Sequence, residues 1–237
     1  MIRLLLSLMV VFLCGCGGGG GTPDSWTSRP KTVKVQWFGN QCFLITSPLG
    51  TRILTNPFAP GSVPHTFPRG IEPEVLLISH ERRDANFTQA IENFPTTLRS
   101  SVGMGSHTAF GIRFLGTPTF PKGNDREIGL MNLVFSWTLD GMRFCFPGDL
   151  PRPLEPSEIS RIGAVDILFL PTGVRADVRQ SLLTGLRPRI IIPMGRTGSV
   201  QSFLSGFPQT FPTGSTTLLL NAATLPAVPT ALALGNP

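Results

Sequence analysis

The sequence predicts an α+β fold in which two mixed sheets pack face to face and helices cover their outer faces. Hydrophobic residues make up 41% of the 237 residues and charged residues 14%, which excludes a disordered chain. The 26 Gly and 23 Pro favour many short strands joined by turns over a helical bundle. Antiparallel strand patterns in the first half give way to alternating strands and helices, so each sheet needs cover on both faces.

A secretory signal is predicted at the N-terminus. Arg3 precedes an apolar stretch at 4–13, which is too short to cross a bilayer as a helix but fits the hydrophobic part of a signal peptide. The stretch ends in LCGC at 13–16, which resembles the bacterial lipobox, since a Leu lies three positions before the last Cys and a small residue directly before it. An ordinary cleaved signal or a hydrophobic anchor is the alternative interpretation.

The lipobox resemblance implies that residues 1–15 are removed and that Cys16 becomes the lipidated first residue of the mature chain. Residues 16–32 would then form a tether that is flexible at five consecutive glycines. The resemblance implies membrane lipid as the partner of Cys16 and the bacterial cell envelope as the location. Gly17 stands where enterobacterial lipoproteins of the inner membrane carry Asp, which favours the outer membrane if the cell has one.

The first half of the folded region, placed at 33–221, carries antiparallel patterns. Alternating residues at 33–37 and an apolar run at 42–46, separated by a Gly-Asn turn, predict a hairpin. A third strand at 52–55 precedes a Pro-rich loop at 57–73. Further strands are expected at 75–79, 98–102, 112–119, 132–139 and 142–146, the last two joined by an Asp-Gly hairpin turn.

The second half predicts parallel strands under helices. Helical patterns are expected at 86–94, 156–162 and 176–184. In the first of them, Asn86 and Gln89 are spaced like a capping box. Apolar strands at 166–170 and 189–193 alternate with the other two, an order typical of parallel pairing. Residues 222–237, rich in Ala, Leu, Pro and Gly, are expected to form an irregular tail.

The order of these signals resembles the metallo-β-lactamase superfamily, nearest to its ascorbate-6-phosphate-lactonase-like branch. Over about residues 33–200, the resemblance is carried in order by VQWFGNQCFLITSPLGTRILTNPF, SHERRDA, FPGDL, DILFLPTG and PRIIIPMGRTG. It implies a four-layer αβ/βα sandwich and metal-dependent hydrolase chemistry. In that chemistry, imidazoles and carboxylates at the sheet edge bind one or two metal ions that activate water.

The metal-binding motif implied by this resemblance is incomplete. The family pattern S-H-x-H-x-D-H falls on residues 79–85, where His80 and Asp84 match but Arg82 and Ala85 replace two histidines. Asp149 matches the Asp that bridges two metals in the family.

Three other family positions have also changed. Asn56 stands in place of an Asp, Gly195 in place of the late His, and 117–122 contain no His. By the resemblance each metal keeps two protein ligands, whereas a catalytic zinc needs at least three. His107 or His65 could complete a site only if the fold brings them in, and otherwise they are surface or capping residues.

Arg82 would place a permanent cation among the remaining carboxylates. We expect its guanidinium to pair with Asp149, with Asp84 nearby, because it compensates charges that a metal would neutralise. A side chain in solvent is the alternative. Arg196 lies in the turn GRTG, which could cradle an anion at a helix start, so Arg82 and Arg196 together predict an anion-binding cleft.

These observations favour a membrane-tethered, non-catalytic binding or scaffold module. No cofactor is expected, and the expected partner is an unknown protein or a small anionic ligand. The alternative is a lactonase-like hydrolase with one weakly bound Zn or Mn on His80, Asp84 and Asp149, the two aspartates being catalytic. Nucleic acid is not expected, because the net charge of +6 is modest and basic residues never form a run of three. Cys42 and Cys145 predict buried thiols, although an exported compartment also allows a disulfide.

Overall fold

The computed structural model describes residues 32–123, 128–195, 200, 203–207, 209–235 and 237. The predicted signal at 1–15, Cys16, all but the last residue of the tether and Arg196 lie outside the described residues. Within the described part of the chain, no helix has the length and apolar character that crossing a membrane would require.

The first of two sheets has six strands. In spatial order they are β13 (Thr217–Leu220), β1 (Val33–Gly39), β2 (Cys42–Thr46), β3 (Arg52–Thr55), β4 (Val75–Leu77) and β5 (Thr96–Leu98). The strands from β13 to β3 pair antiparallel, whereas β3, β4 and β5 pair parallel. This sheet is therefore mixed, as the sequence predicts.

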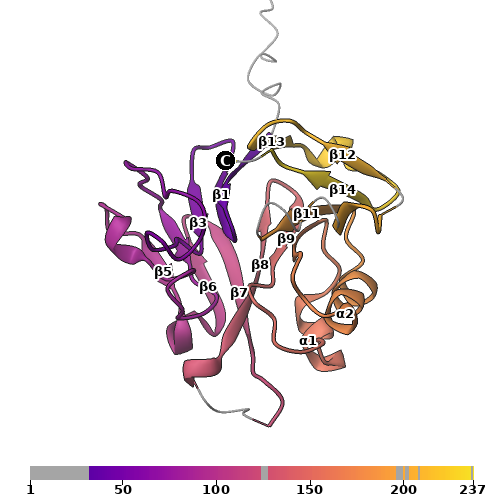
Figure 1. Ribbon diagram of the computed structural model, residues 1–237, viewed down its shortest axis with the longest axis horizontal. Coiled ribbons are helices and arrows are strands. Elements are labelled where there is room, and N and C mark those ends of the chain that lie inside the picture. The colour runs from indigo at the N-terminus through magenta and orange to yellow at the C-terminus, as the bar shows by residue number, and fades with distance from the viewer. Residues whose placement is uncertain (1–31, 124–127, 196–199, 201–202, 208, 236) are drawn as a thin grey trace, which may run out of the picture. The chain divides into compact units, whose positions relative to one another are not determined.

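The second sheet has eight strands and is also mixed (Figure 1). In spatial order they are β12 (Thr210–Pro212), β14 (Thr230–Ala233), β11 (Ile190–Met194), β10 (Ile167–Pro171), β9 (Met142–Phe146), β8 (Asn132–Leu139), β7 (Ile112–Thr119) and β6 (Gly105–Ala109). Strands β9, β10, β11, β14 and β12 are parallel, and β6 to β9 are antiparallel. The predicted α+β sandwich is confirmed.

Helices cover the outer face of the second sheet beside β9, β10 and β11, and two of them lie wholly within the described residues (Figure 1). They are α1 (Pro156–Ile162) and α2 (Ala176–Leu186), both predicted from the sequence. Helix α1 begins with Pro at its first position, and the Glu158 carboxylate accepts a hydrogen bond from the Glu155 backbone N–H at 2.8 Å. It ends at Gly163, whose φ of +72° suits Gly.

Apolar side chains from both sheets meet in one core. The Phe43 ring of β2 lies 4.7 Å from the Phe169 ring of β10, and Phe169 also contacts Phe146 of β9 at 5.9 Å between centroids. Cys42 and Cys145 are buried on the outer faces of different sheets and are free thiols, so the disulfide alternative is wrong. Burial raises the pKa of both thiols, that of Cys145 to about 12.

The hairpin predicted at the Asp-Gly turn is confirmed between β8 and β9. Asp140 has φ +48° and Gly141 has φ +77°, the pair of positive values that a tight two-residue turn requires. The β1–β2 hairpin and the parallel pairing of β9, β10 and β11 are confirmed as well.

The helix predicted at 86–94 is wrong. Only η1 (Thr88–Ala90), a single 3-10 turn, forms there. The Asn86 side chain donates to the Glu81 carbonyl at 2.9 Å instead of capping a helix, and the Phe87 N–H donates to the Pro57 carbonyl at 2.8 Å. Pro95 also disfavours a helical conformation at the preceding residue.

Two strand boundaries also differ. The strand predicted at 75–79 ends at Leu77, because the Ser79 N–H donates to the Asn56 side chain rather than to a neighbouring strand. The strand predicted at 98–102 is β5 followed by the 3-10 turn η2 (Ser100–Gly103). Ser100 has φ +45°, which no strand can accommodate.

The tail predicted to be irregular contributes a strand. Within 222–237, η4 (Ala222–Thr224) precedes β14, which pairs parallel with β11 through Ile190 and Thr230. Strands β6, β12 and β13 were not expected either. Their sequences lack a strong strand pattern, and the hydrogen bonds come from the edge strands that they join.

The outer face of the first sheet is covered by a loop. Residues 57–73, predicted to be a loop, lay Val63, Phe67 and Ile71 on the buried residues Leu54 and Leu76. The turn η3 (Ile128–Leu130) precedes β8 and borders the site that is described next.

Candidate functional site

The residues that follow β4, β9 and β11 meet at one end of the sandwich, here called the site end. The Leu133 N–H of β8 donates to the Ser79 carbonyl at 2.7 Å, which joins the second sheet to the chain after β4. Gly195, after β11, forms a bridge with Asn40, after β1. Because parallel strands finish at the same edge of a sheet, the loops after them can bring side chains from distant parts of the chain together.

Arg82 contacts two carboxylates at the site end. One of its terminal nitrogens forms an ion pair with Asp149, and its Nε lies 3.6 Å from Asp84 Oδ1. The pairing with Asp149 and the proximity of Asp84 that the sequence predicts are confirmed, and the alternative of a free side chain in solvent is wrong. The Arg82 side chain is 58% exposed, so this is a surface contact and not a buried one.

The aspartates hold Arg82 firmly charged. Partial burial lowers the pKa of Arg82, but the hydrogen bond to Asp149 and the charges of Asp149 and Asp84 outweigh that effect and raise the pKa overall. The guanidinium therefore stays a cation at any physiological pH.

His80 lies beside Arg82 and is 6% exposed. Neither of its ring nitrogens has a hydrogen-bond partner among the residues described. Burial, followed by the charge of Arg82, lowers the pKa of His80, although the nearby carboxylates oppose the shift. His80 is therefore a neutral imidazole near pH 7.

Two buried amide side chains hold the loops of the site. Asn56, which has φ +36°, donates to Gln41 Oε1 at 2.9 Å and to Ser79 Oγ at 2.8 Å, and its Oδ1 accepts from the Ser79 N–H. A carboxylate could not make these two donations. The Asn at the position of the family Asp thus has a structural role here.

Asn132 supports the second loop from the first residue of β8. Its Nδ2 donates to Thr119 Oγ1 at 3.1 Å and to the Pro147 carbonyl at 2.8 Å, and its Oδ1 accepts from the Asp149 N–H at 2.9 Å. Gly148 has φ +62°, and a Cβ there would overlap Asn132 and Ser79. The sequence analysis missed Asn132, although an amide at the start of an apolar strand could have indicated it.

Glu81 anchors the loop after β4. It accepts hydrogen bonds from the Arg99 guanidinium and from Ser100 Oγ, the latter at 2.6 Å. Burial raises the pKa of Glu81, but the hydrogen bonds from Arg99, Ser100 and Asn86 outweigh it and lower the pKa overall. This carboxylate is therefore occupied within the fold and was not expected from the sequence.

A cleft of about 270 Å³ opens beside these residues. Its lining includes the apolar residues Leu130 and Met131. Its polar lining residues are His80, Glu81, Arg82, Asn132 and Asp149. A cleft of this size and character fits a small polar ligand.

The donors at the site end do not fit a metal ion. Nowhere in the described ranges do three or more His, Cys, Asp or Glu side chains gather so that they could hold one. Asp84 and Asp149 influence His80 electrostatically without forming such a group, and the Arg82 cation contacts both carboxylates. A fixed positive charge in that position repels a dication.

The other two histidines do not complete the set. His107 of β6 bonds the Met104 carbonyl at 2.9 Å through Nε2, and neither His107 nor His65 lines the Arg82 cleft. The His65 ring lies 5.9 Å from the Trp37 ring, and burial lowers its pKa.

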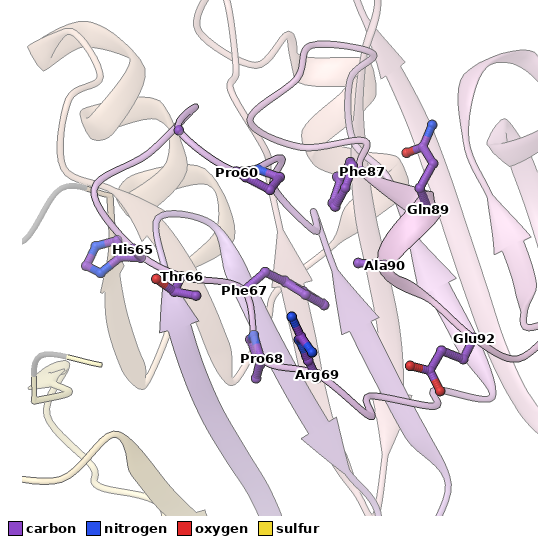
Figure 2. Close-up of a pocket in the computed structure, with 11 residues that line it drawn as sticks. Pro60, His65, Thr66, Phe67, Pro68, Arg69, Phe87, Gln89, Ala90 and Glu92 are labelled. Carbon is purple, nitrogen blue, oxygen red and sulfur yellow. The ribbon is translucent and has the colours of Figure 1, made fainter.

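A larger cleft of about 500 Å³ lies over the loop that covers the first sheet. Figure 2 shows the loop residues from Pro60 to Arg69 on one side of it and Phe87, Gln89 and Glu92 on the other. Phe67 is fixed in this cleft by edge contacts with Phe58 and Phe38. Arg69 and Glu92 are its charged lining residues, and no group of metal-binding side chains is found in it.

Comparisons with known proteins agree with this architecture. Residues 34–195 match a family model described as a beta-lactamase superfamily domain. A search of curated proteins finds no match.

Several solved structures share the fold. One is a candidate zinc-dependent hydrolase of the metallo-β-lactamase superfamily from Thermotoga maritima, with a TM-score of 0.68 and 24% identity over 86% of this chain and 98% of that one. A candidate metal-dependent hydrolase from Parabacteroides distasonis has a TM-score of 0.54 and 20% identity over 73% and 88% of the two chains. A metallo hydrolase from Ignicoccus hospitalis has a TM-score of 0.54 and 16% identity over 86% and 97%. At these identities the likeness establishes the fold alone.

Proposed function

The chain belongs to the metallo-β-lactamase superfamily, and from that premise we propose that it is a membrane-tethered lipoprotein whose domain binds a small anionic ligand without metal-dependent catalysis. One observation carries the proposal. Arg82 contacts Asp149 and Asp84, the residues that match metal-binding positions of the family motif. This contact supports the proposal that the ion pair takes the place of a metal centre.

Arg82 also supplies the means of binding. A guanidinium has five N–H donors in a planar fork, and its contact with Asp84, at 3.6 Å, is longer than a hydrogen bond. A ligand carboxylate or phosphate could replace Asp84 as the second partner and form charge-assisted hydrogen bonds. The exposed fraction of the Arg82 side chain, 58%, leaves it accessible to such a ligand.

A second candidate function is a hydrolase with a reduced, single-metal site. The observation that favours it is His80, because a buried imidazole without a hydrogen-bond partner is costly unless something binds it. Against it stands the donor set, because Arg82 already contacts both aspartates that lie near His80.

Metal analysis of the purified full chain separates the two functions. The chain is isolated without chelator, dialysed gently, and measured for zinc, manganese and iron per mole of protein. The binding module should contain far less than one metal ion per chain. One tightly held ion per chain would refute the proposal and favour the hydrolase.

A matched variant makes the test sharper. Arg82→His with Ala85→His restores two histidines of the family motif, so it should gain zinc affinity if Asp84 and Asp149 still face the vacated position. Arg83→His changes an exposed neighbour and should gain none.

A further inference from the structure

Exposed apolar side chains gather at one end of the domain. Among the residues described, nine large apolar side chains are exposed. Val102 and Met104 lie at the site end, because η2 follows β5 there and Ser100 bonds Glu81, and Leu130 lines the Arg82 cleft. The remaining six lie at the opposite end, where β1 begins at Val33, and we call it the tether end. They are Leu49, Phe94, Phe110, Phe211, Leu219 and Val228.

Strand directions in the first sheet place three of the six. Strand β1 runs from the tether end to the site end, and β2 returns, with Thr46 opposite Lys34. Leu49, in the turn after β2, therefore lies near the start of β1. Leu219 pairs with Lys34 near the end of β13. Strand β5 is parallel to β3 and β4 and so begins at the tether end, directly after Phe94.

Strand directions in the second sheet place the other three. The bridge between Gly195 and Asn40 shows that β11 finishes at the same end as β1. Because β14 is parallel to β11, Val228 lies before a strand start at the tether end. Phe211 of β12 pairs with Leu232 and lines one groove together with Leu219. Phe110 lies in the β6–β7 turn, opposite the end of β8 that borders the Arg82 cleft. Figure 1 shows β12, β13 and β14 gathered at this end, at the top of the view.

The exposure of these residues is extreme at two turns. Leu49 is 95% exposed and Phe94 is 102% exposed, so neither packs against the domain. Single exposed apolar residues are common on soluble proteins, but their concentration at one end marks an interaction surface. Such side chains on protruding loops gain free energy when they enter a lipid interface.

The predicted tether keeps this same end close to lipid. Residues 17–32 separate Cys16 from β1, and a flexible Gly-rich chain of that length has a root-mean-square span of roughly 20 Å. Exposed charged residues near the tether end include Lys34, Arg69, Arg113 and Arg187 against Glu72 and Glu92, which is a modest basic excess. Apolar contact is the main favourable interaction available there, and anionic headgroups add a weaker attraction.

We propose that the tether end rests on the bilayer surface, with Leu49 and Phe94 inserted at headgroup level, so that the Arg82 cleft faces the aqueous phase. This inference rests on the tether proposed above. It adds that the ligand of the Arg82 cleft is a water-soluble molecule that reaches the site from the aqueous side and not from the bilayer.

The experiment uses the full chain, extracted from bacterial membranes and reconstituted into vesicles of phosphatidylethanolamine and phosphatidylglycerol. Leu49→Cys and Phe94→Cys carry an environment-sensitive dye at the tether end. Val102→Cys, 65% exposed at the site end, is the matched control. Cys42 and Cys145 are buried, and the unsubstituted chain measures background labelling.

Flotation and quenching separate the two proposals. We expect the chain to float with the vesicles, and brominated lipids to quench the dye at Leu49→Cys and Phe94→Cys but not at Val102→Cys, with blue-shifted emission only at the first two. Flotation with equal or no quenching at all three positions would overturn the docking and leave the tether intact. A chain that does not float and shows no quenching would overturn both.

Discussion

Arg82→Ala tests whether the ion pair at the site end replaces a metal as the charge that holds two aspartates together. Arg82 and Asp149 are 58% and 42% exposed, and an exposed pair contributes up to about 1 kcal/mol to the free energy of unfolding. Removal of the cation also leaves Asp84 and Asp149 facing each other. Two unit charges about 6 Å apart in water repel by roughly 0.7 kcal/mol.

The expected loss of stability for Arg82→Ala is therefore about 1–2 kcal/mol, which for a chain of this size lowers Tm by about 2–8 °C. Thermal unfolding followed by circular dichroism measures it. Arg175→Ala is the matched control, because Arg175 forms an exposed ion pair with a single carboxylate among the described residues, that of Asp177 at 2.7 Å. That variant should lose less than about 1 kcal/mol.

Salt provides the second comparison for the same pair of variants. At about 1 M salt the screening length falls to roughly 3 Å, so the excess loss of Arg82→Ala over Arg175→Ala should largely disappear. Equal losses at low salt would refute the idea that Arg82 separates two repelling carboxylates. A loss above about 3 kcal/mol would show instead that the pair behaves as a buried one.

Three further predictions follow from the same structure. A strong chelator should leave Tm unchanged because the core is formed by apolar packing of two sheets, and a drop of several degrees that zinc reverses would contradict the proposed function. Cys16→Ala should leave the chain unprocessed or release it from membranes, and normal processing with membrane retention in cell fractionation would argue against the tether. Glu74 forms an ion pair with Arg52 at 2.9 Å, and the hydrogen bonds and charge of Arg52 lower the Glu74 pKa. Because the pKa is lower in the folded state, the Glu74 charge stabilises the fold at pH values above the unfolded pKa of about 4.3, and this stabilisation is lost as pH falls through the folded pKa. Glu74→Gln should therefore reduce Tm at pH 7 but little at pH 3. A Tm difference that stays constant with pH would show that the Glu74 charge does not contribute.

Local sequence patterns determined the elements whose information lies within a few residues. The Asp140-Gly141 turn required positive φ at both positions, so it predicted the β8–β9 hairpin correctly. Helix α1 carries its own start and stop in Pro156 and Gly163. The helix expected at 86–94 failed because Asn86 bonds to Glu81 instead of capping, a choice that neighbouring residues alone do not show.

At the candidate site, the resemblance to the family motif led to the expectation that most metal ligands are missing and that Arg82 stands among those that remain. The resemblance also predicted the pair with Asp149, which lies 67 residues away in the chain, but the completed fold was needed to show that this contact lies at the surface. The completed fold also showed that Asn132 supports the Asp149 loop and that β14 forms by pairing with β11. The physical reason is common to all three: periodicity and turn chemistry act over short distances in the chain, whereas ion pairs, buried amides and edge strands take partners that only the completed fold brings near.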